Sequence, residues 1–268
     1  MTSLLKLDHF SVTAITSSLL SCLVLRRVIK GGISLLFQEN IHPFAYRYSL
    51  QNDKWKAVAS MERERCNFSL IAAQGCLYAI GGDCMQAAEP NNKDSVSACE
   101  CYSPDTNQWK SVQPMPGYRK EHAGAKFGHF LFVSGGLYKN IVLTSTFCYN
   151  AETDVWKQKA PLLIPRAGHV MLVMGHCLYV CGGWREDAES GNRILIDTID
   201  VYDIITDEWK VVAKNPFPRY QGGIVGVDNK IYFIGGSESD GIFNRATGML
   251  ILFIKLDNFT AKNHISIE

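Results

Sequence analysis

The sequence lacks a strong excess of either charge, and this limits the partners that it can hold. Its 268 residues contain 27 lysines and arginines against 26 acidic residues, a net charge of +1. Proteins that hold nucleic acid over a broad surface carry a clear positive excess. The composition therefore argues against nucleic acid as a partner. A hydrophobic share of 47% and a charged share of 20% are typical of a folded globular protein.

The nine cysteines lack the spacing of metal-binding or redox motifs. No Cys-x-x-Cys pair occurs, although such pairs are typical of structural zinc sites and thioredoxin-like redox sites. We therefore expect neither a metal nor another cofactor. Reduced, partly buried thiols in a cytoplasmic protein are the expected state.

The chain also lacks an apolar run long enough to cross a membrane. The run from Phe10 to Leu25 is shorter than the roughly 20 residues that a spanning helix needs, and six of its residues are Ser or Thr. Its positive charges follow the run, whereas a cleavable signal carries them in front. We expect a strand or a disordered leader here, and no membrane contact.

Common catalytic motifs are missing as well. The sequence contains no Gly-x-Ser-x-Gly, no phosphate-binding loop and no paired-carboxylate constellation. We therefore expect no catalytic residue.

What the sequence does contain is one set of residues repeated four times. A tryptophan follows a tyrosine by seven places, an arginine follows that tryptophan by ten, and a Gly-Gly pair follows it by twenty-six. Four residue types that keep these spacings indicate one repeated structural unit. The sets are Tyr48, Trp55, Arg65, Gly81 and Gly82; Tyr102, Trp109, Arg119, Gly135 and Gly136; Tyr149, Trp156, Arg166, Gly182 and Gly183; and Tyr202, Trp209, Arg219, Gly235 and Gly236.

Each unit reads as a four-stranded antiparallel sheet. A short apolar run, rich in β-branched and aromatic residues, ends at each Gly-Gly pair, and a second run with a turn signal precedes it. These runs predict a hairpin of strands A and B. Strand C ends at the repeated tyrosine and strand D starts at the repeated tryptophan. Successive Gly-Gly pairs lie 47 to 54 residues apart. Sheets of this size bury their faces by radial stacking, which predicts an all-β fold of the β-propeller type, with the Tyr and Trp rings packed between blades.

The Gly-Gly, Tyr-x6-Trp and Trp-x9-Arg matches resemble the kelch repeat, and in particular the kelch-like adaptors, over about residues 28 to 236. The resemblance implies a kelch-type propeller that binds proteins. In such adaptors the propeller reads the substrate of a cullin-RING ubiquitin ligase, while a BTB domain and a helical BACK linker precede it. Binding to actin or the cytoskeleton is the alternative that the resemblance leaves open.

A kelch-fold enzyme is the least favoured alternative. Copper radical oxidases and sugar isomerases share the architecture, but a copper site needs tyrosines and histidines that converge on the channel. Only His122 and His169 lie at comparable strand-A positions, and two imidazoles without a third ligand are more typical of surface or core residues.

The repeats are incomplete at both ends of the sequence. Three blades, from Arg65 to about Ala213, are complete, with partial blades on either side. Ile15 stands where an arginine is expected, and Leu252 and Phe259 have the spacing of Tyr and Trp but not their chemistry. We predict a leader at residues 1–22 outside the repeat pattern, kelch repeats over 23–236, and a divergent tail at 237–268. Because kelch-like propellers usually close with six blades, this pattern predicts a truncated or alternatively spliced product, and cullin binding would need a BTB domain that these residues do not contain.

The antiparallel order of the strands predicts where a partner binds. The D–A and B–C connections share one rim, and the repeated arginines, Arg65, Arg119, Arg166 and Arg219, start strand A on that rim. Guanidinium groups hold carboxylates bidentately, and in the adaptors that this sequence resembles, arginines at this position help to read acidic peptides. The open alternative is that these arginines bond to the backbone of a neighbouring blade.

Further candidates lie on the same rim. Trp184, the one tryptophan outside the repeat position, follows a Gly-Gly pair beside Arg185 and would be a binding hot spot if exposed. Packing under its own loop is the alternative. The remaining candidates are Tyr220, His122 and His169, with Arg63, Asn67, Tyr118 and Lys120 nearby and the long loops at residues 83–97 and 184–197. The expected ligand is a protein or peptide, acidic peptides included.

Overall fold

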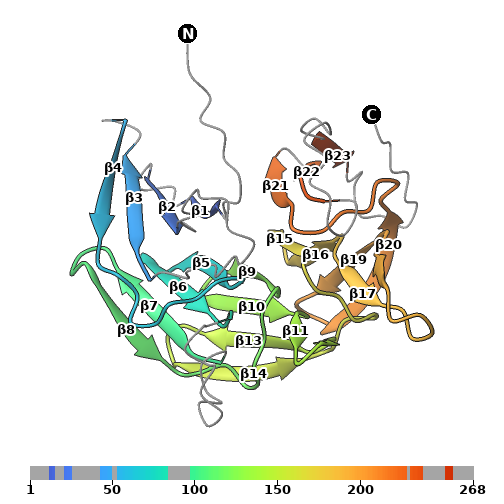
Figure 1. Cartoon of the computed structure of the whole chain (residues 1–268), viewed down its shortest axis with the longest axis horizontal. Helices are drawn as coiled ribbons and strands as arrows, with labels where there is room; N and C mark the ends of the chain where they lie inside the picture. The colour runs from blue at the N-terminus through green and yellow to red at the C-terminus, as the bar shows by residue number, and fades with distance from the viewer. Residues whose placement is uncertain are drawn as a thin grey trace, which may run out of the picture. The chain divides into compact units, whose positions relative to one another are not determined.

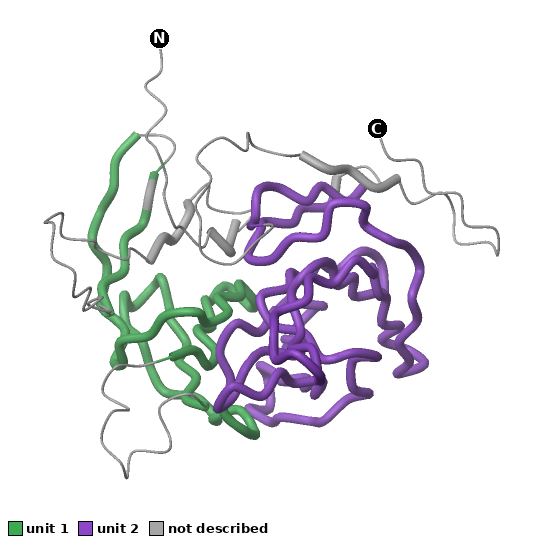
Figure 2. Tube along the Cα trace, turned by 45° about the vertical axis from the view of Figure 1, so that its right-hand side comes forward, with its two compact units in different colours: residues 1–118 green, residues 119–268 purple. Residues whose placement is uncertain are grey.

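A computed structural model of the chain describes residues 12–15, 21–25, 43–49, 53–83, 97–227, 230–237 and 251–255. All regular elements in these ranges are β-strands (Figure 1). No helix in the described ranges is long and apolar enough to span a membrane. The chain divides into two compact units, residues 1–118 and 119–268 (Figure 2).

The first unit contains two four-stranded antiparallel sheets, each with its strands in chain order. One sheet consists of β1 (Val12–Ile15), β2 (Ser21–Leu25), β3 (Ala45–Ser49) and β4 (Lys54–Val58). The other consists of β5 (Ser69–Ala73), β6 (Cys76–Ile80), β7 (Cys99–Ser103) and β8 (Gln108–Val112).

The second unit contains two four-stranded sheets and one of three strands. The first is built from β9 (Ala123–Phe127), β10 (Phe130–Ser134), β13 (Thr146–Asn150) and β14 (Val155–Lys159). The second is built from β15 (Val170–Met174), β16 (Cys177–Cys181), β19 (Thr198–Asp203) and β20 (Glu208–Lys214). The third has β21 (Gly223–Val227), β22 (Lys230–Ile234) and β23 (Ile251–Lys255). Two small hairpins, β11 (Leu137–Tyr138) with β12 (Ile141–Val142) and β17 (Trp184–Glu186) with β18 (Arg193–Leu195), lie in the B–C loops.

The predicted all-β fold of four-stranded blades is confirmed. The three blades predicted to be complete are the sheet β5–β8, the sheet of β9, β10, β13 and β14, and the sheet of β15, β16, β19 and β20, and we name them blades 1, 2 and 3. The flanking sheets differ in detail from the expectation. β1 lies inside the predicted leader and pairs with β2 through an irregular register, so one of the two alternatives for this segment, a strand, holds for residues 12–15. β23 lies inside the predicted tail and pairs with β22.

The sequence pattern explains which strands are inner and which are outer. All five residues of β16 and four of the five in β10 are buried, as continuous apolar runs predict. The D strands β8 and β14 keep most of their residues exposed. The glycine pair that ends strand B is needed for close approach: Gly136 has a φ of 97°, and a Cβ there would lie 2.7 Å from the carbonyl oxygen of Lys120.

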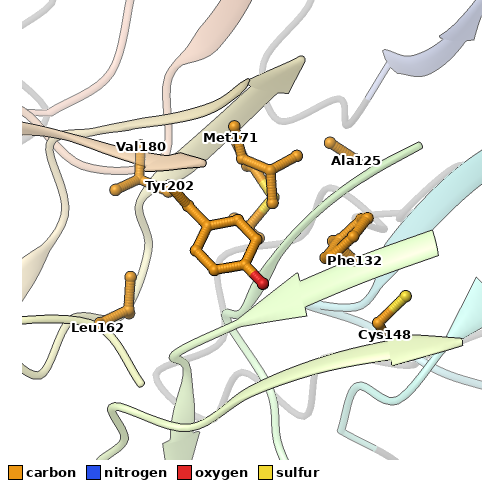
Figure 3. Packing of buried hydrophobic residues seen from close by; sticks show 9 residues of the cluster. Ala125, Phe132, Cys148, Leu162, Met171, Val180 and Tyr202 are labelled. Carbon is orange, nitrogen blue, oxygen red and sulfur yellow. The ribbon is translucent and has the colours of Figure 1, made fainter. Parts of the chain in front are cut away.

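The repeated tyrosine and tryptophan face each other across strands C and D. In blade 3 the rings of Tyr202 and Trp209 lie 5.0 Å apart, and Trp209 Nε1 donates to the carbonyl of Ala160 at 2.9 Å. Ala160 belongs to the D–A connection that leaves blade 2, so the indole links two blades. Figure 3 shows the same interface from close by, with the Tyr202 ring among Phe132, Met171 and Leu162.

One further residue of each repeat was missed in the sequence. Asn107, Asp154 and Asp207 stand two places before the tryptophan, each with φ between 51° and 59°. Each accepts a hydrogen bond from the hydroxyl of the repeated tyrosine. Asp207 also accepts one from the backbone N–H of Ala160 at 2.9 Å. The signal was available, because a short Asp or Asn recurs at this position.

Candidate functional site: the loop rim

The D–A and B–C connections meet at one end of every repeat. A pair of residues, one from each connection, forms an isolated antiparallel bridge in each of the four repeats: Cys66 with Asp83, Lys120 with Leu137, Ala167 with Trp184, and Tyr220 with Ser237. The Lys120–Leu137 bridge has N–H···O distances of 3.0 and 2.7 Å. The topological inference that the two connections share one side is therefore correct within each repeat. We call this end of a blade its rim.

The four repeated arginines lie inside the rim and not on it. Arg65, Arg119, Arg166 and Arg219 are 5%, 2%, 0% and 5% exposed. In blade 2, Arg119 Nη1 donates to the carbonyls of Gly135 and Ser145, both at 3.0 Å, and Nη2 donates to Ser145 Oγ at 2.7 Å. One carbonyl ends strand B and the other precedes strand C. The side chain therefore joins the two ends of the B–C loop.

The same pair of carbonyl bonds recurs in blades 1 and 3, and in the fourth repeat Arg219 bonds to the second glycine of its pair. Arg65 Nη1 donates to Gly81 O at 2.9 Å and to Ala98 O at 2.8 Å. Arg166 Nη1 donates to Gly182 O at 3.3 Å and to Thr198 O at 3.4 Å, and Arg219 Nη1 donates to Gly236 O at 3.1 Å. Buried carbonyls need donors, and these arginines supply them. The structure thus favours the alternative in which these arginines bond to backbone over the one in which they bind a partner. That alternative is corrected in one respect, because the backbone that each arginine holds belongs to its own blade and not to a neighbouring one.

The charge beside these arginines differs from blade to blade. The position two places before the repeated tyrosine is Glu100, Phe147 and Asp200 in blades 1, 2 and 3. Arg65 forms a buried ion pair with Glu100, and Arg166 Nη2 lies 2.7 Å from Asp200 Oδ2. Arg119 instead lies over the ring of Phe147, at 4.9 Å from its centroid. Burial lowers the pKa of Arg119 to about 10, so it stays cationic at neutral pH.

The two histidines predicted to face a partner are buried as well. His122 and His169 stand three places after Arg119 and Arg166, with exposures of 6% and 5%. His169 Nε2 lies 2.9 Å from Ser134 Oγ. Burial, followed by the charges of Arg166, His122 and Arg119, holds the pKa of His169 well below its usual range. His169 is therefore a neutral core residue, and its ring is not offered to a ligand on the surface.

Trp184 packs under its own loop, as the alternative for this residue stated. It is 5% exposed and contacts Leu137 and Ala167 in a small apolar cluster against which Tyr220 also packs. The guanidinium of Arg193 covers the ring at 4.1 Å from its centroid, and Nε1 donates to Glu121 Oε2 at 3.2 Å. The prediction of an exposed tryptophan is corrected, because the β17–β18 hairpin folds back over the ring.

What the rim of the second unit does present is loop side chains. Ile141, Leu163 and Phe217 are 63%, 50% and 49% exposed. Lys139 and Arg193 are exposed and Arg185 is half-buried. Asp187, an acidic residue of the longest of these loops, accepts a hydrogen bond from Ser190 Oγ at 2.7 Å, which heads the causes of its lowered pKa. In the first unit Arg63 and Asn67 are exposed, whereas loop residues 84–96 lie outside the described ranges.

Comparison with known proteins decides the family. The sequence matches the KLHDC2/KLHL20/DRC7 Kelch-repeats domain over residues 28–236. The chain belongs to the kelch-repeat family. This kelch-repeat protein is 30% identical to Kelch-like protein 26 of Danio rerio over 210 residues, which are 78% of this chain and 33% of the relative. It is 36% identical to Kelch-like protein 36 of Rattus norvegicus over 91 residues, 34% of this chain and 14% of the relative.

Relatives outside the Kelch-like proteins match the repeats too. The kelch-repeat chain is 32% identical to beta-scruin of Limulus polyphemus over 200 residues, 72% of this chain and 21% of the relative. It thus spans a third or less of the length of these three curated relatives. The solved structure of YjhT aligns with a TM-score of 0.72 at 14% identity, covering 92% of this chain and 81% of that one. At that identity the likeness concerns the fold alone.

Proposed function

We propose that this kelch-repeat chain is the substrate-recognition part of a cullin-RING ubiquitin-ligase adaptor and that it holds a protein segment on the rim of its blades, in the cytoplasm. The observation that carries the proposal is the contrast between repeated anchoring residues and variable loops at the rim. The arginine, the glycine pair and the backbone bridge repeat in each blade, whereas the loops that they anchor differ in length and sequence. Variable loops on a rigid scaffold are where binding residues concentrate.

Three cations in the loops of the second unit suit an acidic ligand, beside the exposed Glu186 and Glu189 of the β17–β18 loop. Lys139 and Arg193 are exposed in the two B–C hairpins, and Arg185 stands beside them in sequence on β17. Ile141 offers apolar surface on the same β11–β12 hairpin as Lys139. Cations with adjacent apolar surface suit an extended peptide that alternates acidic and apolar residues. The repeated arginines support this surface from inside by holding the loop ends.

A peptide selection tests this proposal directly. The immobilised chain is exposed to a displayed library of random peptides, and the enriched sequences are then titrated at low and high salt. We expect acidic peptides to be enriched, with affinity that falls as salt rises, because rim charges are screened. The double variant Lys139→Glu/Arg185→Glu should lose at least about tenfold in affinity, or roughly 1.4 kcal/mol.

The matched control is the double variant Lys110→Glu/Lys157→Glu, on the D strands β8 and β14. Both lysines are exposed, and the double change alters the net charge by as much as the test variant does, so it tests whether net charge alone matters. Equal loss in both variants, or enrichment of peptides without acidic residues, would reject an acidic ligand on the rim.

The cytoskeletal alternative is supported by one observation. Beta-scruin and alpha-scruin each match over 72% of this chain, nearly as much as the 78% that Kelch-like protein 26 matches. Co-sedimentation of the chain with actin filaments distinguishes the two. Binding to filaments that Lys139→Glu/Arg185→Glu leaves unchanged would favour the cytoskeletal function. The proposal assigns no catalytic residue, and His122 and His169, three places after their repeat arginines, are buried.

A further inference from the structure

A cluster of three potential metal ligands lies at the end of blade 3 that is opposite its rim. His176 lies in the turn between β15 and β16, Cys177 begins β16, and Asp203 ends β19. Cys177 and Asp203 are register partners across the two strands. One potential ligand atom from each side chain lies within 4.8 Å of the other two, and His176 Nε2 is 3.7 Å from Asp203 Oδ2.

We propose that His176, Cys177 and Asp203 bind a divalent transition-metal ion of the zinc class. Imidazole nitrogen, thiolate sulfur and carboxylate oxygen are the three donor types that hold Zn²⁺ in proteins. A tetrahedral site with bonds of about 2.0–2.3 Å places its ligand atoms roughly 3.5 Å apart. The separation of His176 Nε2 from Asp203 Oδ2, 3.7 Å, is near that spacing, and the other two separations are at most 4.8 Å. His176 is exposed in its turn, so its ring can close the remaining gap.

The surroundings orient two of the ligands. Asp203 Oδ1 accepts the N–H of Ile205 at 2.8 Å and that of Thr206 at 3.3 Å. These bonds fix the carboxylate, and the Ile205 bond is the largest cause of its lowered pKa, while Oδ2 is left facing His176. Cys177 is buried, and its pKa is raised by that burial and by Asp203, with Lys210 opposing. The metal takes the thiolate form, so binding releases the Cys177 proton to solvent.

The other blades show that the repeat itself does not require these residues. The same three positions hold Gly75, Cys76 and Ser103 in blade 1, and His129, Phe130 and Asn150 in blade 2. Phe130 and Asn150 pair across their strands just as Cys177 and Asp203 do. Both blades form the same four-stranded sheet without the ligand set. The fold of a blade therefore does not require this set of residues, although Cys177 itself packs in the apolar core of blade 3, and His129 offers a matched control in an equivalent turn.

Three protein ligands leave one tetrahedral position open. In zinc sites this position is filled by water or by a ligand from another molecule. The proposed ion would join the A–B turn to the end of strand C at the end of the blade away from the rim. It is independent of the peptide-binding proposal and stands or falls separately from it.

Cobalt titration of the whole chain tests the site. The purified protein is stripped with a chelator and titrated with Co²⁺, and Zn²⁺ is then added as a competitor. We expect a single equivalent of Co²⁺ to give thiolate-to-cobalt charge-transfer absorption together with the visible bands of a four-coordinate ion, all displaced by Zn²⁺. Cys177→Ser should abolish the charge-transfer absorption. His176→Gln should weaken binding by at least about tenfold, since the loss of outer-shell partners alone has that effect.

Two further measurements keep the result decisive. His129→Gln should bind as the wild type does. In the unaltered chain, Zn²⁺ should slow the alkylation of Cys177 by at least about tenfold, because a bound thiolate is masked, while Cys66 reacts unchanged. A wild-type spectrum without thiolate charge transfer would overturn the proposal. So would alkylation of Cys177 that Zn²⁺ does not slow, or equal losses in His176→Gln and His129→Gln.

Discussion

Blades 2 and 3 balance the same buried arginine in different ways. In blade 3 Arg166 has a carboxylate beside it, Asp200, at 2.7 Å. In blade 2 Arg119 has an aromatic face beside it, Phe147, at 4.9 Å from the ring centroid. Both arginines hold the carbonyls at the two ends of their B–C loops. The common element is therefore the pair of loop carbonyls, and the group that faces the charge can vary.

The largest effect is expected from removing the arginine that has a carboxylate partner. Arg166→Ala leaves Asp200 buried without its counter-charge, and breaking a buried ion pair costs about 3–5 kcal/mol in the free energy of unfolding. Arg119→Ala leaves no buried charge behind, and we expect about 1–3 kcal/mol from the unmet loop carbonyls. Urea unfolding of both variants measures the two losses. Equal losses would show that the Asp200 carboxylate does not make Arg166→Ala more destabilising than Arg119→Ala.

Asp200→Asn sharpens the comparison by giving blade 3 an uncharged neighbour, as in blade 2. The amide retains the shape of the carboxylate and can still accept from Arg166. Because Arg119 is accommodated without a carboxylate, we expect a loss of only about 1–3 kcal/mol, clearly less than for Arg166→Ala. A loss as large as that of Arg166→Ala, measured by the same urea unfolding, would contradict the view that the loop carbonyls are the main partners of the buried arginine.

The lowered pKa of His169 should make the stability of the protein depend on pH. Its pKa is lowered in the folded state by burial and then by Arg166, His122 and Arg119. Below the unfolded pKa of about 6.5, His169 therefore binds a proton in the unfolded chain but not in the folded chain. Stability should fall with decreasing pH there, by about 1.4 kcal/mol per pH unit for this one group. His169→Gln should lessen that slope by the same amount. A slope that the variant does not change would show that His169 is protonated in the folded protein.

The smallest effect is expected at the aromatic neighbour in blade 2. Phe147→Leu keeps an apolar side chain under Arg119 but removes the π face. We expect a loss of about 0.5–2 kcal/mol, the range of a cation–π contact from exposed to desolvated settings. Thermal and urea unfolding measure it, with Phe130→Leu in the same blade as the control for loss of an aromatic ring. A loss that matches Arg119→Ala would mean that Phe147, and not the loop carbonyls, holds the arginine.

The blades could be predicted from the sequence, because the signals for their strands and turns are local. Apolar runs that end in Gly-Gly predict strand B, and the order of four antiparallel strands predicts that the D–A and B–C connections meet, as the Lys120–Leu137 bridge confirms. β1 was harder to predict, because Ile15 stands at the arginine position and no turn signal precedes β2. Its pairing depends on partners that lie farther along the chain.

The direction of a side chain was not predictable in the same way. The spacing places Arg119 at the start of strand A, but whether it points outward depends on the carbonyls of Gly135 and Ser145, which only the folded loop brings within 3.0 Å. Trp184 likewise depends on the hairpin that returns over it. No spacing motif in the sequence indicates the proposed metal ligands, because it is strand register that brings Cys177 to Asp203, 26 residues away in sequence.

Residue-by-residue arginine modification tests the central claim most directly, namely that the repeated arginines are internal supports and the loops are the surface. The folded chain is treated with phenylglyoxal, and the rate at each arginine is followed by mass spectrometry. The buried Arg119 and Arg166 should react far more slowly than the exposed Arg63 and Arg193, and should reach the same rates in urea. Modification of Arg119 and Arg166 at the rate of Arg193 in the folded protein would contradict the account.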